Sequence, residues 1–107
     1  MDSNALIVLC TCPDQESAER IANHLVEHRL AACVNISSPV KSVYRWQGEI
    51  ETADEYMLFI KTSASSYDEL ERTIMSAHPY EFPEVVAVPV ERGQQNYLGW
   101  ITQCTSK

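Results

Sequence analysis

Four cysteines and three histidines are the side chains of this sequence that could bind a transition-metal ion. Thiolate and imidazole groups are ligands that suit copper and zinc. Cys10 and Cys12 are two positions apart, so in an extended chain both side chains lie on the same side. His24 and His28 are four positions apart, a spacing that can chelate a metal on one face of a helix. Buried thiols and a solvated histidine pair are the structural alternatives for these positions.

The third histidine, His78, lies in the segment SAHPYEFPEV, which spans residues 76–85. The residue before a proline is biased away from helical backbone angles, so Pro79 predicts that His78 marks the end of a helix. Its imidazole could serve as a metal ligand, as a general base, or as a polar group at a rigid corner. The residues around it leave all three roles open.

Carboxylates gather in the segment GEIETADE, which contains Glu49, Glu51, Asp54 and Glu55. These groups could collect hard cations, but the ligand spacing of an EF-hand loop is absent, so we interpret them as a solvated hairpin tip. Lys61 ends the apolar run MLFIK, and its charge therefore needs a partner or an open cleft.

The motifs of several enzyme classes are absent from the sequence. It contains no Ser-His-Asp order, no Walker loop, no G-x-G-x-x-G and no H-E-x-x-H. Only three glycines occur, so a phosphate-binding loop is not expected. Paired carboxylates exist, but nothing in the sequence places them in a cleft. We therefore do not expect an enzyme.

The elements that must position these residues follow from the apolar patterning. A continuous apolar run predicts a buried strand, and apolar residues every three or four positions predict a helix. Strands are expected at 5–10, at 30–38 with an interruption or bend near Ser38-Pro39, and at 41–62 as a hairpin reversing near Gly48. A last strand is expected at 83–91, where a proline predicts a sheet edge or a strand end. Helices are expected from Pro13 or Asp14 to His28 or Arg29, at 63–78 with a serine cap, and at 96–104. This order is the α+β, ferredoxin-like β-α-β-β-α-β arrangement with a short C-terminal helix.

Length and charge restrict the class of protein. A chain of 107 residues predicts one domain, 1–107, and a net charge of −7 argues against nucleic-acid binding. No apolar run approaches the ~20 residues that span a bilayer, and the start lacks the basic region of a signal peptide. We expect a cytoplasmic protein with reduced thiols. The face of the sheet away from the helices needs cover, which predicts a homo-oligomer.

Five separated segments, in order along the chain, resemble the CutA family of divalent-cation tolerance proteins. They are RLAACVNI (29–36), YRWQGEIE (44–51), EYMLFIKT (55–62), HPYEFPEVVAVPV (78–90) and YLGWI (97–101). The resemblance runs from about Ala5 to Cys104. It implies a ferredoxin-like subunit and a homotrimer built through the long hairpins, similar to the PII signalling proteins. It also implies a cytoplasmic role in tolerance of copper and other divalent metals.

The resemblance also implies a copper site made of a cysteine at the end of the first strand and a His-His pair before Pro-Tyr. Cys10 matches the cysteine, and His78 matches the second histidine of the pair. Ala77 takes the place of the first histidine and cannot ligate a metal. The expected ligands of Cu(II) are therefore Cys10 and His78, completed by Cys12, by water or by a residue of another subunit.

A second candidate site is a cleft between subunits. Polar and aromatic residues interrupt segments that should pack between subunits, and they could line a pocket for a small ligand, as in PII-like trimers. The residues are Tyr44, Trp46, Glu55, Lys61 and Tyr80. On this alternative the chain is a PII-like signalling or ligand-binding trimer and metal tolerance is indirect. An interface network between subunits is the structural alternative.

Overall fold

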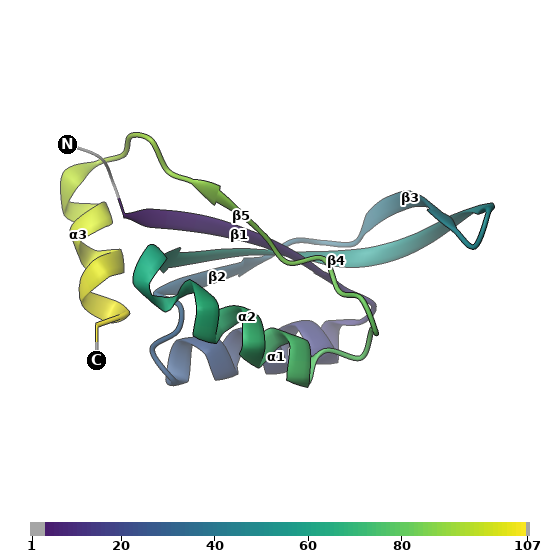
Figure 1. The fold of residues 1–107 in the computed structure, drawn as a ribbon, viewed down its shortest axis with the longest axis horizontal. Helices are drawn as coiled ribbons and strands as arrows, with labels where there is room; N and C mark the ends of the chain where they lie inside the picture. Colours follow the sequence, from purple (N-terminus) through teal and green to yellow (C-terminus); the bar gives the residue numbers. More distant parts are fainter. Residues whose placement is uncertain (1–3, 107) are drawn as a thin grey trace.

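The apolar segment near the start of the chain forms an inner strand of an antiparallel sheet (Figure 1). β1 (Ala5–Cys12) pairs along its whole length with β4 (Glu49–Ser63) and, on its other side, with β5 (Val86–Pro89). β2 (Cys33–Ile36) lies on the far side of β4, so the strand order is β2-β4-β1-β5. This order, with two helices as crossovers, confirms the predicted ferredoxin-like α+β arrangement.

This structure is a computed structural model, and it describes residues 4–106. The predicted domain limits, 1–107, include residues 1–3 and 107, which lie outside the described residues. Within the described part, no helix has both the length and the apolar character needed to cross a membrane.

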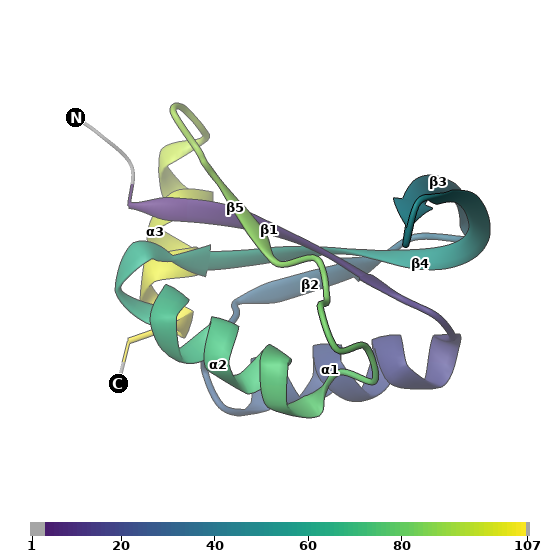
Figure 2. The same ribbon diagram turned by 45° about the vertical axis from the view of Figure 1, so that its right-hand side comes forward.

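A long hairpin projects from the body of the molecule (Figures 1 and 2). β3 (Val40–Trp46) pairs with the first half of β4, and the turn between them uses Gln47 and Gly48 at φ values of 49° and 83°. Glycine adopts such angles without strain, which is why the reversal falls near Gly48 as predicted. The hairpin gives the molecule a longest dimension of 44 Å.

Two helices cover one face of the sheet, and a third packs at its end (Figure 2). They are α1 (Gln15–Glu27), α2 (Tyr67–Ala77) and α3 (Gln95–Cys104). The Asp14 carboxylate caps α1 by accepting the Ser17 N–H over 2.7 Å, and this bond holds the pKa of Asp14 below its usual value. After Glu27, Arg29 adopts a φ of 60°, which ends the helix where the sequence predicts.

The predicted serine cap of the second helix is wrong. A 3₁₀ turn, Ala64–Ser66, precedes α2, and Ser66 at the cap position makes no side-chain capping bond. The hydroxyl of Ser63 instead bonds the Thr105 hydroxyl over 2.9 Å, and the Ser66 hydroxyl donates to the Thr105 carbonyl over 3.2 Å. These serines therefore hydrogen-bond the residue that follows α3, and they do not cap α2.

Two predicted strands are shorter in the structure. The range 30–38 contracts to β2 because the N–H groups of Leu30 and Ala31 both donate to the Leu25 carbonyl and finish α1. The range 83–91 contracts to β5, whose Val86 pairs with Leu9. β5 is an edge strand and ends at Pro89, as its proline predicts.

The core lies between the sheet and the helices. Its largest side chains come from β1, β4, α1 and α2 and are at most 2% exposed: Val8, Leu58, Ile60, Ile21, Leu25, Leu70 and Ile74. The helix residues recur at intervals of three or four positions, which is the apolar stripe read from the sequence.

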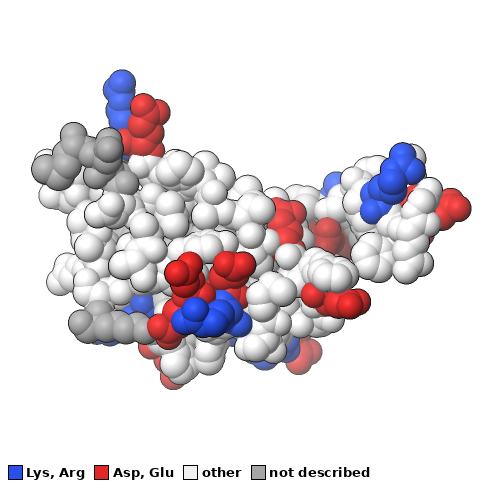
Figure 3. Space-filling view, in the orientation of Figure 1, with Lys and Arg blue, Asp and Glu red and all other residues white. Residues whose placement is uncertain are grey.

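The opposite face of the sheet is apolar, and α3 packs against one end of it, where Ile101 contacts Ala5. Residues paired in register point to the same side, so Ile7 and Leu9 share this face with Phe59, Val86 and Val88. Val86 and Val88 are 50% and 49% exposed. Figure 3 shows charged side chains over the helices and on the projecting hairpin, while much of the surface over β1 and β5 is uncharged.

Two adjacent residues of α2 test which face of this helix packs against the sheet. Ile74 is fully buried, whereas Met75 is 45% exposed. We expect Ile74→Ala to lower the free energy of unfolding by about 2–5 kcal/mol through the lost contacts and the cavity left behind. Met75→Ala should change it by less than about 0.5 kcal/mol. Urea unfolding at one fixed chain concentration measures both, and equal effects would contradict the placement of α2.

Candidate metal centre

One group of three ligand-type side chains lies close enough together to share an ion in the described part of the chain. It consists of Cys10, Cys12 and His78, with one ligand atom of each within 4.8 Å of the others. Both cysteines are fully buried, and His78 is 8% exposed. We call these three residues the Cys-His cluster.

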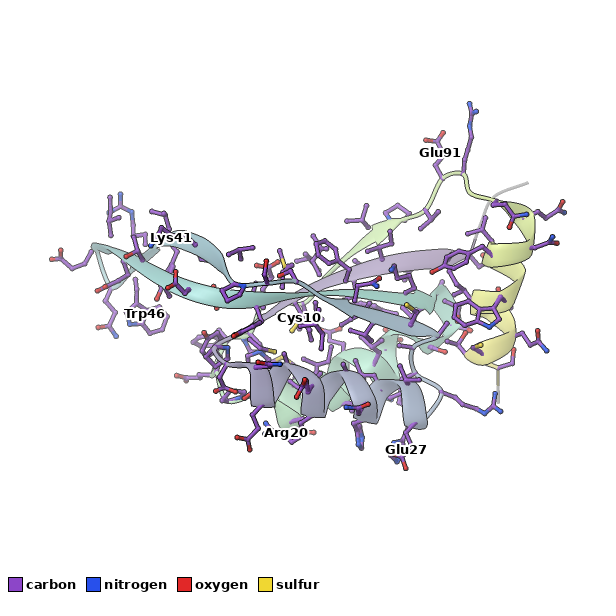
Figure 4. All side chains as sticks on the ribbon, turned by 180° about the vertical axis from the view of Figure 1, so that it is seen from behind. Cys10, Arg20, Glu27, Lys41, Trp46 and Glu91 are labelled. Atoms are coloured by element: carbon purple, nitrogen blue, oxygen red, sulfur yellow. The ribbon has the colours of Figure 1, made fainter. Side chains whose placement is uncertain are left out.

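The strand pairing positions the two thiols. Cys10 pairs with Leu58 and Cys12 with Tyr56, so both side chains point toward the helices, on the face that holds the core. Figure 4 shows Cys10 between the sheet and the helices, with Arg20 turned outward. The period-2 alternation of the sequence correctly predicts that the two thiols share a side. Cys12 is the last residue of this strand and is fully buried.

The end of α2 positions the imidazole. His78 caps α2 with extended backbone angles, φ −82° and ψ 140°, as expected for a residue before proline. Its Nε2 donates to the Thr11 carbonyl over 2.7 Å, and its Nδ1 accepts the Tyr80 N–H over 3.1 Å. Nε2 also lies 3.7 Å from the Cys12 sulfur. The ring therefore reaches β1 from 66 residues away in sequence.

The two thiols differ in acidity. Hydrogen bonding with the Cys12 thiol, together with burial, raises the pKa of Cys10 far above its usual value. The same bond lowers the pKa of Cys12, against the opposing effect of burial. Cys12 is therefore the first of the pair to form the thiolate that binds metals.

The cluster fits a soft metal ion in the type and spacing of its donors. Two ligands of a tetrahedral zinc ion, one sulfur and one nitrogen, lie about 3.5 Å apart, close to the observed contact between Cys12 and His78. Thiolate and imidazole donors suit copper and zinc more than calcium or magnesium. A metal would have to displace the Nε2 proton of His78 as well as thiol protons.

Ala77, at the position where the family resemblance places a first histidine, brings no donor to the cluster. Its side chain packs against the core, and its carbonyl accepts a bond of 3.3 Å from Arg20. Cys12 is the third ligand-type side chain of the cluster, and it is one of the completions that the sequence left open.

The other sequence candidates for metal binding lie outside this cluster. The rings of His24 and His28 stack with centroids 4.1 Å apart, and the Nδ1 of His28 lies 3.0 Å from the His24 carbonyl. The hairpin carboxylates Glu49, Glu51 and Asp54 are exposed and form no three-ligand group among residues 4–106.

The five residues proposed for a ligand cleft lie in three places within one subunit. The Tyr80 hydroxyl donates to the Glu55 carboxylate over 2.8 Å, and Tyr44 lies near enough to affect the pKa of Tyr80. Trp46 pairs with Glu49 near the tip of the hairpin (Figure 4).

The remaining cleft residue, Lys61, lies on the apolar face of the sheet, where it pairs with Ile7 and Cys33. Its ammonium group donates to the Asn35 side chain. The sequence predicts that the charge of Lys61 needs a partner or an open cleft, and the structure identifies Asn35 as the partner.

Removing the Cys10 thiol should shift the pKa of the remaining thiol, Cys12. In Cys10→Ala the bond that lowers the pKa of Cys12 is lost, so the Cys12 thiol should ionise at a higher pH than in the wild type. The ¹³Cβ shift of Cys12 followed against pH measures this. Cys104→Ala is the control and should leave the curve in place. A Cys12 curve that is the same in wild type and Cys10→Ala would contradict the assigned bond.

Comparison with known proteins identifies the family. A family model described as CutA1 divalent ion tolerance protein matches residues 6–104. The divalent-cation tolerance protein CutA of Thermus thermophilus is 44% identical over 99 residues, which cover 92% of this chain and 96% of that protein. Protein CutA of Mus musculus is 46% identical over 95 residues, 89% of this chain but 54% of that protein. The chain thus spans about half the length of the mouse relative.

Solved structures agree with this match. The crystal structure of CutA from Xylella fastidiosa superposes with a TM-score of 0.95 at 43% identity, covering 97% of this chain and all of that one. A structure from Archaeoglobus fulgidus, described as a periplasmic divalent cation tolerance protein CutA, gives 0.92 at 39% identity and covers 95% and 99% of the two chains. With the family match over residues 6–104, these relatives show that the chain belongs to the CutA1 divalent ion tolerance protein family.

Proposed function

We propose that this chain binds copper or another divalent metal ion through Cys10, Cys12 and His78, and that it contributes to metal tolerance by holding the ion. The observation that carries the proposal is the close approach of three soft ligand atoms in a chain of the divalent ion tolerance family. The two sulfurs come from one strand, and the imidazole comes from the end of a helix. Because the cluster is buried, a bound ion would be shielded from water and from other ligands.

A cytoplasmic location is part of this proposal. Cys10, Cys12, Cys33 and Cys104 are all free in the structure. Free thiols are typical of reducing compartments, and a metal site with two sulfur ligands depends on keeping them reduced. Relatives are described as periplasmic in Archaeoglobus fulgidus and as chloroplastic in Arabidopsis thaliana, so location varies among similar chains.

We further propose that the chain assembles as a homotrimer of the PII-like kind. On the apolar sheet face, Phe59, Val86 and Val88 are between 38% and 50% exposed, and exposed apolar side chains gathered on one face are typical of an interface between proteins. The hairpin beside it extends far enough to contact a second subunit (Figure 1). The sequence resemblance sets the expected number of subunits at three.

Metal titration tests the site. We expect wild type to bind Zn²⁺ and copper under anaerobic conditions, and Cys12→Ala or His78→Ala to weaken binding by at least about tenfold. Binding should weaken as the pH falls, because protons compete with the metal for the sulfurs. Cys104→Ala is the matched control and should bind like the wild type. Equal affinities in all four proteins would place the metal elsewhere.

Light scattering after size exclusion tests the assembly. Three chains of 12.1 kDa give an expected mass of about 36 kDa. Val88→Asp, which places a charge on the apolar sheet face, should reduce the mass toward that of one chain. Met75→Asp introduces the same charge at a similarly exposed position on α2 and should leave the mass unchanged. A wild-type protein with the mass of a monomer at micromolar concentration would contradict the proposal.

A further inference from the structure

Both ring nitrogens of His78 are already occupied by backbone groups. Nε2 faces the Thr11 carbonyl at 2.7 Å, and Nδ1 faces the Tyr80 N–H at 3.1 Å. A carbonyl oxygen can only accept a hydrogen bond, and a backbone N–H can only donate one. The ring is therefore neutral with its proton on Nε2. This is the nitrogen nearest to Cys12, and it has no lone pair available for a metal.

Metal binding through Nε2 therefore requires a change of tautomer. The proton must leave Nε2 by exchange with solvent, and another must be taken up on Nδ1, because a metal-bound imidazole carries its proton on the other nitrogen. The ring charge is the same before and after this exchange. Nδ1 would then present a donor toward the Tyr80 N–H, which is also a donor. The contact between His78 and the Tyr80 main chain must break.

The side chain of Tyr80 opposes that movement. Its hydroxyl donates to Oε2 of Glu55 over 2.8 Å, and its ring lies against the imidazole with centroids 4.9 Å apart. Glu55 is 7% exposed and pairs with Val40 at the base of the projecting hairpin. The bond from Tyr80 thus joins the segment after α2 to a buried acceptor in β4.

We propose that Tyr80 and Glu55 form a latch that holds His78 in the tautomer that cannot bind a metal through Nε2, and that metal capture opens this latch. The inference rests on the proposed metal-binding function and adds two positioning residues that do not touch the ion. By linkage, whatever stabilises the closed latch weakens metal binding, and a bound metal weakens the latch by the same factor. Because Glu55 lies at the base of the hairpin, the latch connects the Cys-His cluster to the arm that we propose contacts other subunits.

An opposite role for the same contact makes the inference testable by the sign of the effect. If the bond between Tyr80 and Glu55 preorganised His78 for the metal, loosening it would weaken binding. If it is a latch, loosening it strengthens binding. Tyr80→Phe removes the hydroxyl and keeps the ring that packs on the imidazole.

The experiment measures the dissociation constant for Zn²⁺ by chelator competition in four chains: wild type, Tyr80→Phe, His78→Ala and the double variant. Zn²⁺ is the probe because it cannot oxidise the thiols. We expect Tyr80→Phe to bind about threefold to tenfold more tightly than wild type, the value of one hydrogen bond. The same change in the His78→Ala background should have no effect. Tyr67→Phe also removes a hydroxyl bonded to a glutamate, Glu71, and as the control should bind like the wild type.

Each other outcome decides against the latch. Weaker binding by Tyr80→Phe shows preorganisation, and an equal gain with and without His78 shows an effect that bypasses the ring. No change in either background shows that the imidazole rotates without moving Tyr80. A wild-type chain that binds no Zn²⁺ overturns the proposed function and this inference with it, whereas tight wild-type binding with an inert Tyr80→Phe overturns the inference alone.

A second readout does not depend on a measured affinity. The ¹⁵N shifts of the His78 ring should report the Nε2–H tautomer in the metal-free chain and the Nδ1–H tautomer after Zn²⁺ is added. A metal-free ring already protonated on Nδ1 would overturn the latch, whatever the affinities.

Discussion

The unequal lengths of two paired strands shape the whole molecule. β4 has 15 residues, and β1, its partner in the sheet, has 8. The pairing is continuous from Ala5 with Ser63 to Cys12 with Tyr56, so the first half of β4 leaves the sheet with β3 as its partner. The second half lies inside the sheet and carries core residues. The projecting hairpin is a direct result of this mismatch.

The same boundary between sheet and hairpin determines where the chemistry lies. Cys12 is the last residue of β1 and pairs with Tyr56, and Glu55 is the next residue of β4 toward the hairpin. The segment after α2 crosses this boundary. His78 therefore hydrogen-bonds the carbonyl of Thr11 near the end of β1, and Tyr80 hydrogen-bonds Glu55. Donors for a metal and a contact that restrains one of them therefore occur within a few residues of each other. A longer β1 would cover this junction and leave no room for the segment after α2.

Much of the fold is readable from the sequence because its signals are local. The apolar stripe of α1, the reversal at Gly48 and the proline that ends β5 each depend on neighbouring residues. The shared side of Cys10 and Cys12 follows from strand alternation in the same way. Serine capping of α2 fails as a prediction because the hydroxyls find long-range partners at the end of α3.

No pattern among neighbouring residues predicts the contacts that bring the candidate site together. His78 and Thr11 are 67 residues apart, and Tyr80 and Glu55 are 25 apart, so their approach depends on how α2 packs across the sheet. The sequence identifies His78 as a helix exit and as a family match, but not its two backbone partners. Those partners fix the tautomer of the ring, and the tautomer decides whether the residue can ligate as it stands.

Charge provides a further constraint on the proposed site. With two protonated thiols and a neutral ring, the Cys-His cluster has no net charge, which suits its burial. A divalent ion that displaces both thiol protons would keep the total at zero, and a monovalent ion would do so by displacing the Cys12 proton alone. The carboxylates of Glu55 and Glu84 act on Cys10 and oppose an additional negative charge there. Softness alone would admit monovalent copper. Burial therefore links the charge of an ion in the proposed site to the number of thiols that ionise, and a divalent ion would have to overcome the raised pKa of Cys10.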